Sequence, residues 1–303
     1  MKQIIECVPN FSEGRDPQKV AAIAGAVRAV AGVKVLDLTS DPDHNRSVLT
    51  MAGDSDAVRR GALALLEAAI ARIDLTSHQG QHPRIGAVDV IPFIPIRNAT
   101  AADCVALARA VGEEAAARFG LPVYLYEDAA TREERRNLSS IRKGEFEGLR
   151  EKMEKPDWKP DFGPDRPHPT AGASVIGARM PLIAYNINLG TADFSVADTI
   201  AKSIRHLGGG FRFCKAMGVE LKDRGIVQVS INMTNFRKTP LHRVFECVKS
   251  EAARYGVNVV GSEIVGLTPA EALYQAAEFY LRIEKFSPSV VLETQLMEAD
   301  GGS

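Results

Sequence analysis

The order of expected strands and helices repeats along this chain. Residues 4–96 alternate apolar runs with turn residues in the order strand, helix, strand, strand, helix, strand, and residues 182–267 show the same order. This βαββαβ order is typical of the ferredoxin-like motif, in which a mostly antiparallel sheet carries helices on one face. The sequence therefore predicts an α/β (α+β) protein of two ferredoxin-like subdomains, with the sheets facing each other and the helices outside.

The expected boundary lies near residue 180, with one subdomain in residues 1–180 and the other in residues 181–303. Residues 131–180 are first charged and then rich in proline and glycine, without clear periodicity, so they are interpreted as a connector that forms a binding loop or lid. The strand at residues 86–96 contains Pro92 and Pro95, which favour an edge, a bulge or a sheet terminus there.

The net charge and the spacing of the cysteines argue against several classes of protein. The 37 basic and 38 acidic residues give a net charge of -1, which argues against a dedicated nucleic-acid binder. The four cysteines lie far apart, so neither a zinc ribbon nor a disulfide framework is indicated. No signal peptide or membrane-spanning run is evident, and a cytoplasmic protein without membrane contact is expected.

The segment "SHQGQHPR" places two histidines four residues apart. Gly80 lies between them and Pro83 follows, so the segment is expected to be a turn rather than the helix of a zinc site, and no metal is expected. An imidazole before a buried strand suits proton transfer near neutral pH, which favours a general acid or base role for His82. His78 is interpreted as a turn residue. Asn10 and Asn186 follow or end apolar strands and are either turn residues or amides that line a cleft.

Long blocks of the sequence carry a family resemblance. The blocks are "IIECVPNFSEGRD", "GQHPRIGAVDVIPFIP", "PVYLYEDAA", "PDWKPDFGP", "GARMPLIAYNINL" and "VVGSEIVGLTP". In these blocks the chain resembles the glutamate formiminotransferase family and is similar to its stand-alone bacterial form, and the resemblance extends from Gln3 to about Phe286. The resemblance implies transfer of a formimino group from N-formimino-L-glutamate to tetrahydrofolate, giving 5-formiminotetrahydrofolate and L-glutamate, in histidine breakdown. A homodimer is implied as well.

The resemblance also implies site residues. The catalytic histidine of the family matches His82, and its folate-contacting loop matches Gly163, Pro164, Asp165, Arg166, Pro167, His168, Pro169, Thr170, Ala171 and Gly172. Around Thr39 better-known members have an acidic residue, whereas the acids of this chain in that stretch are Asp37, Asp41 and Asp43. No carboxylate partner for the histidine is therefore inferred.

The implied chemistry needs a proton to leave N5 of tetrahydrofolate and another to reach the departing glutamate nitrogen. One histidine performs both tasks in turn, and Arg46 and Arg84 are candidate contacts for glutamate carboxylates, or else surface ion pairs. Three alternatives remain open at this point. They are a glutamate N-formyltransferase that uses formyl-tetrahydrofolate, a non-catalytic folate-binding protein, and a metallohydrolase.

Overall fold

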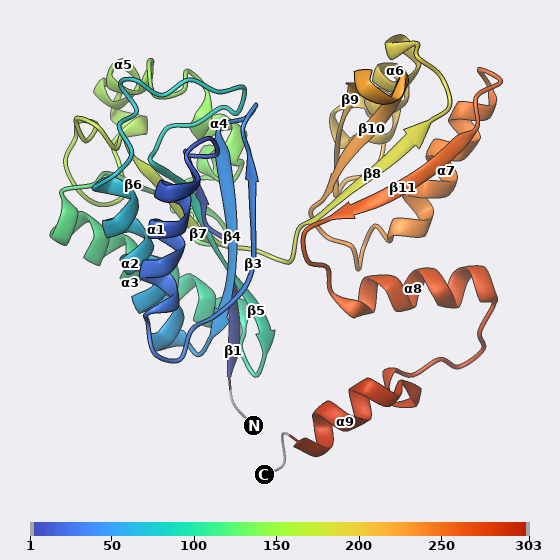
Figure 1. The fold of residues 1–303 in the computed structure, drawn as a ribbon, viewed down its shortest axis with the longest axis horizontal. Helices are drawn as coiled ribbons and strands as arrows, with labels where there is room; N and C mark the ends of the chain where they lie inside the picture. Colours follow the sequence, from blue (N-terminus) through green and yellow to red (C-terminus); the bar gives the residue numbers. More distant parts are fainter. Residues whose placement is uncertain (1–2, 301–303) are drawn as a thin grey trace. The chain divides into compact units, whose positions relative to one another are not determined.

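The computed structural model describes residues 3–300, and its contacts divide into two compact units between Arg179 and Met180 (Figure 1). The first unit contains β1 (Ile4–Cys7), β2 (Asn10–Phe11), α1 (Pro17–Arg28), β3 (Lys34–Asp41), β4 (Arg46–Gly53), α2 (Ser55–Ile70), β5 (Val88–Arg97), α3 (Ala101–Phe119), β6 (Val123–Glu127), α4 (Leu138–Arg142), α5 (Leu149–Glu154) and β7 (Ser174–Ala178). The second contains β8 (Ile183–Leu189), α6 (Phe194–Ile204), β9 (Cys214–Leu221), β10 (Ile226–Met233), α7 (Leu241–Ala253), β11 (Val259–Val265), α8 (Ala270–Leu281) and α9 (Leu292–Asp300).

The expected βαββαβ repeat is confirmed by the strand order in each unit. In the first unit the strands run β3-β4-β1/β2-β5, and in the second they run β9-β10-β8-β11, so each places its second, third, first and fourth strands in that order. All pairs within these two sets are antiparallel. The predicted packing of one sheet against the other stays a prediction.

Local sequence signals account for the helix boundaries. The Asp16 carboxylate accepts hydrogen bonds from the amides of Gln18 and Lys19 at the start of α1, and Pro17 occupies the first turn. Thr100 and Asp103 form a capping box that begins α3, which ends at Gly120 in the left-handed conformation.

The connector interpretation of residues 131–180 is wrong in part. These residues form α4 and α5, and they end in β7, which is buried along its whole length and lies parallel between β5 and β6. The run "SVIGA" is a short apolar strand of the kind expected inside a parallel sheet, and parallel neighbours must be reached through a long crossover. The first sheet therefore extends beyond the ferredoxin-like pattern.

One of the three alternatives that Pro92 and Pro95 left open is present in the sheet around β5. This strand is not an edge, because it pairs with β1 and β2 on one side and with β7 on the other. The partner strand is interrupted at Val8 and Pro9, opposite Pro92, and its register shifts between Ile4 and Ile5, opposite Pro95. The bulge alternative is thus the one that the structure shows.

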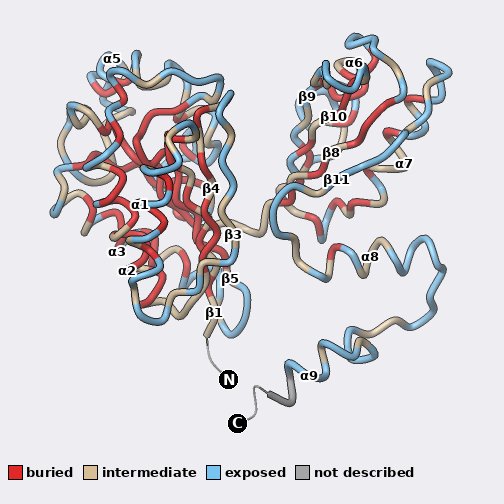
Figure 2. The backbone as a smooth tube through the Cα atoms, viewed as in Figure 1, coloured by how far each residue is buried: buried red, intermediate tan, exposed pale blue. Residues whose placement is uncertain are grey.

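Each unit has its own apolar core (Figure 2). In the first unit, α1, α2 and α3 cover one face of the sheet, while α4 and α5 cover the other face over β5, β7 and β6. In the second unit, α6 and α7 cover one face. Cys7 is buried in the first core and packs as a small apolar residue.

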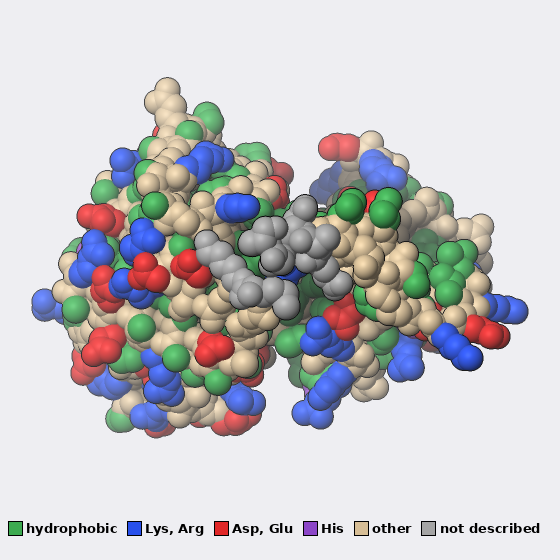
Figure 3. Space-filling view, turned by 90° about the horizontal axis from the view of Figure 1, so that it is seen from below, with side chains coloured by type: hydrophobic (Ala, Val, Ile, Leu, Met, Phe, Trp, Pro, Cys, Tyr) green, Lys and Arg blue, Asp and Glu red, His purple; other side chains and the backbone are tan. Residues whose placement is uncertain are grey.

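Two observations concern the surface. On the face seen in Figure 3, basic and acidic side chains are interspersed over both units. Within residues 3–300, no helix is long and apolar enough to cross a bilayer.

Candidate active site

The two histidines lie in residues 75–86, an irregular segment between α2 and β5 that is called the histidine loop below. The Gln81 amide donates to the Asp43 carbonyl at 3.1 Å, and the Leu75 amide donates to the Thr170 carbonyl at 2.8 Å. Gly80 packs on the His44 backbone so closely that a Cβ would clash with the His44 carbonyl. These contacts hold the loop between the β3–β4 turn and residues 167–173, and they confirm the expected turn.

His82 is half-buried, and no group that the structure describes donates a hydrogen bond to its ring or accepts one from it. Burial, followed by the positive charges of Arg142 and Arg46 and by His44 and His78, lowers its pKa to about 2. The imidazole is therefore neutral at physiological pH. Neither ring nitrogen has a hydrogen bond to a described residue, so each of the two is unoccupied by the protein.

His78 has a different role. Its Nε2 lies 3.0 Å from the Asn45 carbonyl oxygen, and its Nδ1 accepts a hydrogen bond from Arg84 Nε at 3.2 Å. The ring is thus in the tautomer with the proton on Nε2, and burial lowers its pKa. His78 is a structural residue of the loop. Among the side chains that the structure describes, no group of three or more His, Cys, Asp or Glu is arranged to hold a metal ion.

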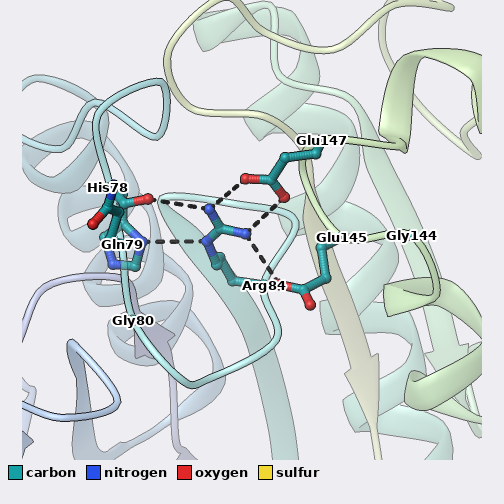
Figure 4. Close-up of a pocket in the computed structure, with 7 residues that line it drawn as sticks. All are labelled: His78, Gln79, Gly80, Arg84, Gly144, Glu145 and Glu147. Carbon is teal, nitrogen blue, oxygen red and sulfur yellow. Dashed lines mark hydrogen bonds and ion pairs between the residues drawn. The ribbon is translucent and has the colours of Figure 1, made fainter.

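Arg84 is buried and fully engaged by the protein (Figure 4). Its guanidinium points between the histidine loop and the segment that follows α4, where it meets Glu145 at 3.0 Å and Glu147 at 2.7 Å. Its remaining donors reach the His78 ring and carbonyl. Because all five N–H groups have protein acceptors, Arg84 has no donor left for a substrate carboxylate in this structure.

Arg46 and Asn10, two of the predicted substrate contacts, lie together. Arg46 Nη1 donates to Asn10 Oδ1 at 3.3 Å, while Arg46 Nε is buried without an acceptor. Burial and the neighbouring Arg142 lower the pKa of Arg46. A buried guanidinium nitrogen without an acceptor is costly, so an anionic ligand is favoured at this position.

Arg142, at the end of α4, is a residue of this site that the sequence did not reveal. Its Nε donates at 2.8 Å to Asp89 Oδ2, and its Nη2 donates to the same oxygen. Asp89 is 1% exposed, and its other carboxylate oxygen accepts from the Ile85 amide at 2.9 Å. Arg142 lies in the charged stretch "IRKGEFEG", where no pattern distinguishes it from a surface arginine.

The second half of the predicted folate loop is hydrogen-bonded to the histidine loop and to the residue that follows it. The Ala87 amide donates to the Ala171 carbonyl at 3.0 Å, Gly86 bridges to Gly172, and the His168 amide closes the turn on the Gly172 carbonyl at 2.8 Å. Between the two loops lies a pocket of about 580 Å³. It is lined by Leu75, Thr76, Ser77, His78, Gln79, Phe146, Glu147, Arg150, Glu151, Pro167, His168 and Pro169.

Two other predicted positions lie apart from this cluster. Asp165, in the first half of the folate loop, pairs with Lys159 at 2.9 Å. Asn186 lies in the second unit on β8, where its Nδ2 donates to Glu263 Oε1 at 3.1 Å. Gln228 donates to the same carboxylate at 3.0 Å and to Asn188 Oδ1 at 2.8 Å, so these amides form a polar network on the sheet of the second unit.

Each of the two units matches a family model of known proteins. Residues 4–179 match the family model "Formiminotransferase domain, N-terminal subdomain", and residues 184–299 match "Formiminotransferase domain". A glutamate formimidoyltransferase of Streptococcus pyogenes serotype M1 is 49% identical over 98% of this chain and 100% of its own length.

Two further relatives differ in length. A glutamate formimidoyltransferase of Thermoplasma acidophilum is 48% identical over 98% of both chains. A formimidoyltransferase-cyclodeaminase of Dictyostelium discoideum is 44% identical over 94% of this chain and 54% of its own length. The chain belongs to the formiminotransferase family.

Proposed function

We propose that this protein transfers the formimino group of N-formimino-L-glutamate to N5 of tetrahydrofolate, giving 5-formiminotetrahydrofolate and L-glutamate. The relatives named glutamate formimidoyltransferase support the donor class, because they match this chain over almost its full length. The observation that carries the proposal is the neutral His82 ring, which has no hydrogen bond to a described residue and lies three residues after the part of the histidine loop, Leu75–Gln79, that lines the pocket.

In the proposed reaction, N5 of tetrahydrofolate attacks the amidine-like carbon of the donor. His82 takes the N5 proton as the new C–N bond forms, and it then gives a proton to the glutamate nitrogen as the old C–N bond breaks. The imidazole thus ends as it began. Binding both substrates side by side supplies the orientation that attack by a weak amine needs.

Different site residues are proposed to bind each of the two substrates. The folate loop, Gly163–Gly172, and the pocket that it shares with the histidine loop are assigned to tetrahydrofolate, which is a co-substrate here. Arg46 with Asn10 is assigned to a glutamate carboxylate, because its Nε is buried without an acceptor. Arg84 is assigned to holding the two loops in place, and Asn186 stays a candidate contact from the second unit.

The proposals on metal requirement, pathway, compartment and assembly rest on membership of the family. The proposed step moves a proton and a one-carbon group, and it needs no metal. Its place is histidine breakdown in the cytoplasm, and a homodimer is the proposed assembly. The small-molecule substrates are its expected partners.

A donor comparison tests the proposal. The purified protein is mixed with tetrahydrofolate and N-formimino-L-glutamate, or with tetrahydrofolate and N-formyl-L-glutamate, and the folate product is followed with time. Multiple turnovers with the formimino donor and much slower ones with the formyl donor are expected. The reverse preference identifies a formyltransferase, and folate binding without turnover identifies a non-catalytic binding protein.

A further inference from the structure

His168, in the second half of the folate loop, takes part in the turn that closes this loop. Its Nδ1 accepts a hydrogen bond from the Ala171 amide at 3.0 Å and a longer one from the Thr170 amide at 3.4 Å. The backbone closes the same turn, because His168 and Gly172 exchange amide-to-carbonyl hydrogen bonds of 2.8 and 3.1 Å. A ring nitrogen that accepts hydrogen bonds carries no proton, so the proton of the neutral ring lies on Nε2.

The turn therefore makes Nε2 of His168 a hydrogen-bond donor. This nitrogen is the one farther from Cβ, and it has no acceptor among the residues that the structure describes. His168 is half-buried and lines the pocket between the folate loop and the histidine loop. Burial also lowers the pKa of His168, which favours the neutral ring over the imidazolium. The pocket lining thus includes a donor that the folate loop itself holds in place.

Other residues of the lining supply apolar surface and an acceptor. Phe146, Pro167 and Pro169 offer apolar surface against which a planar ring can pack. Glu151, on α5, has a carboxylate without a partner among the described residues. A pocket of about 580 Å³ with apolar walls and a few polar groups is typical of sites for small organic ligands.

These groups match one end of tetrahydrofolate. The pterin end is a flat bicyclic ring whose edge carries a carbonyl acceptor at position 4 beside two donors, N3–H and the 2-amino group. The other end is a glutamate, whose carboxylates call for cations. Arg150 is the one Arg or Lys side chain among the described residues of the lining, and Glu151 follows it directly. The lining therefore favours the pterin end, with a donor for its carbonyl and a carboxylate for its N–H groups.

We propose that this pocket binds the pterin ring, and that Nε2 of His168 donates a hydrogen bond to the carbonyl oxygen at position 4 of that ring. The inference rests on the proposed function, because it names the part of tetrahydrofolate that the pocket binds. It makes His168 a specificity-determining residue, since a ring with an amino group at position 4 places a donor against the donor of His168. A site built around such a hydrogen bond rejects an analogue that cannot make it.

Two substitutions separate the roles of the two nitrogens of the His168 ring. In His168→Asn, the amide oxygen takes the place of Nδ1, so the acceptor for the Ala171 amide is kept and the outer donor is lost. In His168→Gln, the amide nitrogen reaches the place of Nε2, so a donor is kept and the acceptor of the turn is lost. His206→Asn, at an exposed histidine in the turn after α6, is the matched control.

The test measures dissociation constants by calorimetry, without oxygen, for tetrahydrofolate and for 4-amino-4-deoxytetrahydrofolate with the full chain of each protein. The wild type and His206→Asn are expected to prefer tetrahydrofolate by at least about tenfold. His168→Asn is expected to bind tetrahydrofolate about tenfold more weakly, and its preference is expected to be about tenfold smaller. His168→Gln is expected to keep more of the preference than His168→Asn does.

Thermal unfolding checks the turn in the same proteins. His168→Asn is expected to have the wild-type midpoint within about 2 °C, because the acceptor of the turn is kept. His168→Gln is expected to unfold about 2–4 °C lower, because the Ala171 and Thr170 amides lose their acceptor.

The inference is overturned if folded His168→Asn binds tetrahydrofolate as tightly as the wild type, or if both proteins have the same preference between the two ligands. Its failure is distinct from failure of the proposed function. Formimino transfer by the wild type, together with an unchanged preference in His168→Asn, refutes the pterin contact alone. A reduced preference in His168→Asn, in a protein that transfers no formimino group, refutes the proposed reaction and leaves the pterin contact standing.

Discussion

The two histidines of the histidine loop, His78 and His82, differ in their hydrogen bonds. His78 uses both ring nitrogens, while the His82 ring has no bond to any described residue. The residue pattern around Gly80 and Pro83 was enough to argue against a helical metal site and to favour His82. It was not enough to show that His78 is fixed by Arg84, since that contact depends on a fold around the whole loop.

At residue scale, Arg84→Met is expected to lower the free energy of unfolding by about 2 kcal/mol. The change removes a buried guanidinium that binds Glu145, Glu147 and His78. The expected loss in the free energy of unfolding is modest because both glutamates are partly exposed to solvent. Urea denaturation measures the loss. Arg60→Met, at an exposed ion pair, is the control and should stay within about 0.5 kcal/mol of the wild type. Equal stability of the two variants would refute the structural role of Arg84.

The same ion pair predicts a pH dependence. The hydrogen bond from Arg84 lowers the pKa of Glu147, so its contribution to stability is complete above the unfolded-state pKa of about 4.3. The contribution is lost as pH falls through the lower pKa of the folded state. The free energy of unfolding should therefore fall more gently with acid in Arg84→Met than in the wild type. Parallel profiles below about pH 5 would argue against the pairing.

At element scale, the sequence predicted most helices and strands but missed β7. Periodicity within a window finds amphipathic elements such as α1 and α3, and caps such as Asp16 and Thr100 mark where they begin. The strand β7 is five residues long, buried on both faces and preceded by a proline-rich segment, so nothing local distinguishes it from a loop. Its place between β5 and β6 follows from long-range pairing.

The short helix α4 ends in Arg142, which binds the buried carboxylate of Asp89. Its carbonyl end is held by Lys152, whose Nζ donates to the carbonyls of Ser140 at 2.7 Å, Ile141 at 2.6 Å and Lys143 at 3.1 Å. A lysine that satisfies the last carbonyls of a helix stabilises that end. No sequence pattern indicated this arrangement, because its groups are about ten residues apart and share no periodicity.

Lys152→Met is therefore expected to loosen α4, to lower the free energy of unfolding by about 1–2 kcal/mol and to raise the KM for the formimino donor. Steady-state kinetics and urea denaturation provide the two readouts. Lys155→Met, an exposed lysine just after α5, is the matched control and should change neither. Wild-type values of both quantities in Lys152→Met would show that α4 keeps its place without this contact.

At the scale of the whole molecule, the chain consists of two units, each with a sheet and a core of its own. The repeated βαββαβ order was visible in the sequence because it depends on hydrophobic patterning along the chain. The site in the first unit was visible only in part, since Asp89, Arg142 and the pairing of Arg84 come together through tertiary structure.

Separate cores lead to a prediction about fragments. Residues 180–303 expressed alone are expected to fold into the β9-β10-β8-β11 sheet, because apolar residues such as Ile187, Val229 and Val244 are buried by other residues of the same unit. Dispersed amide signals in NMR and a cooperative thermal transition would show this. A fragment with the narrow signal range of an unfolded chain would contradict it.

The central claim is that His82 carries the proton in formimino transfer. The most direct measurement is kcat with N-formimino-L-glutamate and tetrahydrofolate for the wild type, His82→Gln and the control Arg60→Gln, with urea denaturation of each. The account predicts that His82→Gln is as stable as the wild type within about 0.5 kcal/mol, since the His82 ring makes no hydrogen bond to a described residue, and that the kcat of the variant is about 10²- to 10⁴-fold lower. A folded His82→Gln protein that turns over within about twofold of the wild-type rate would contradict the account.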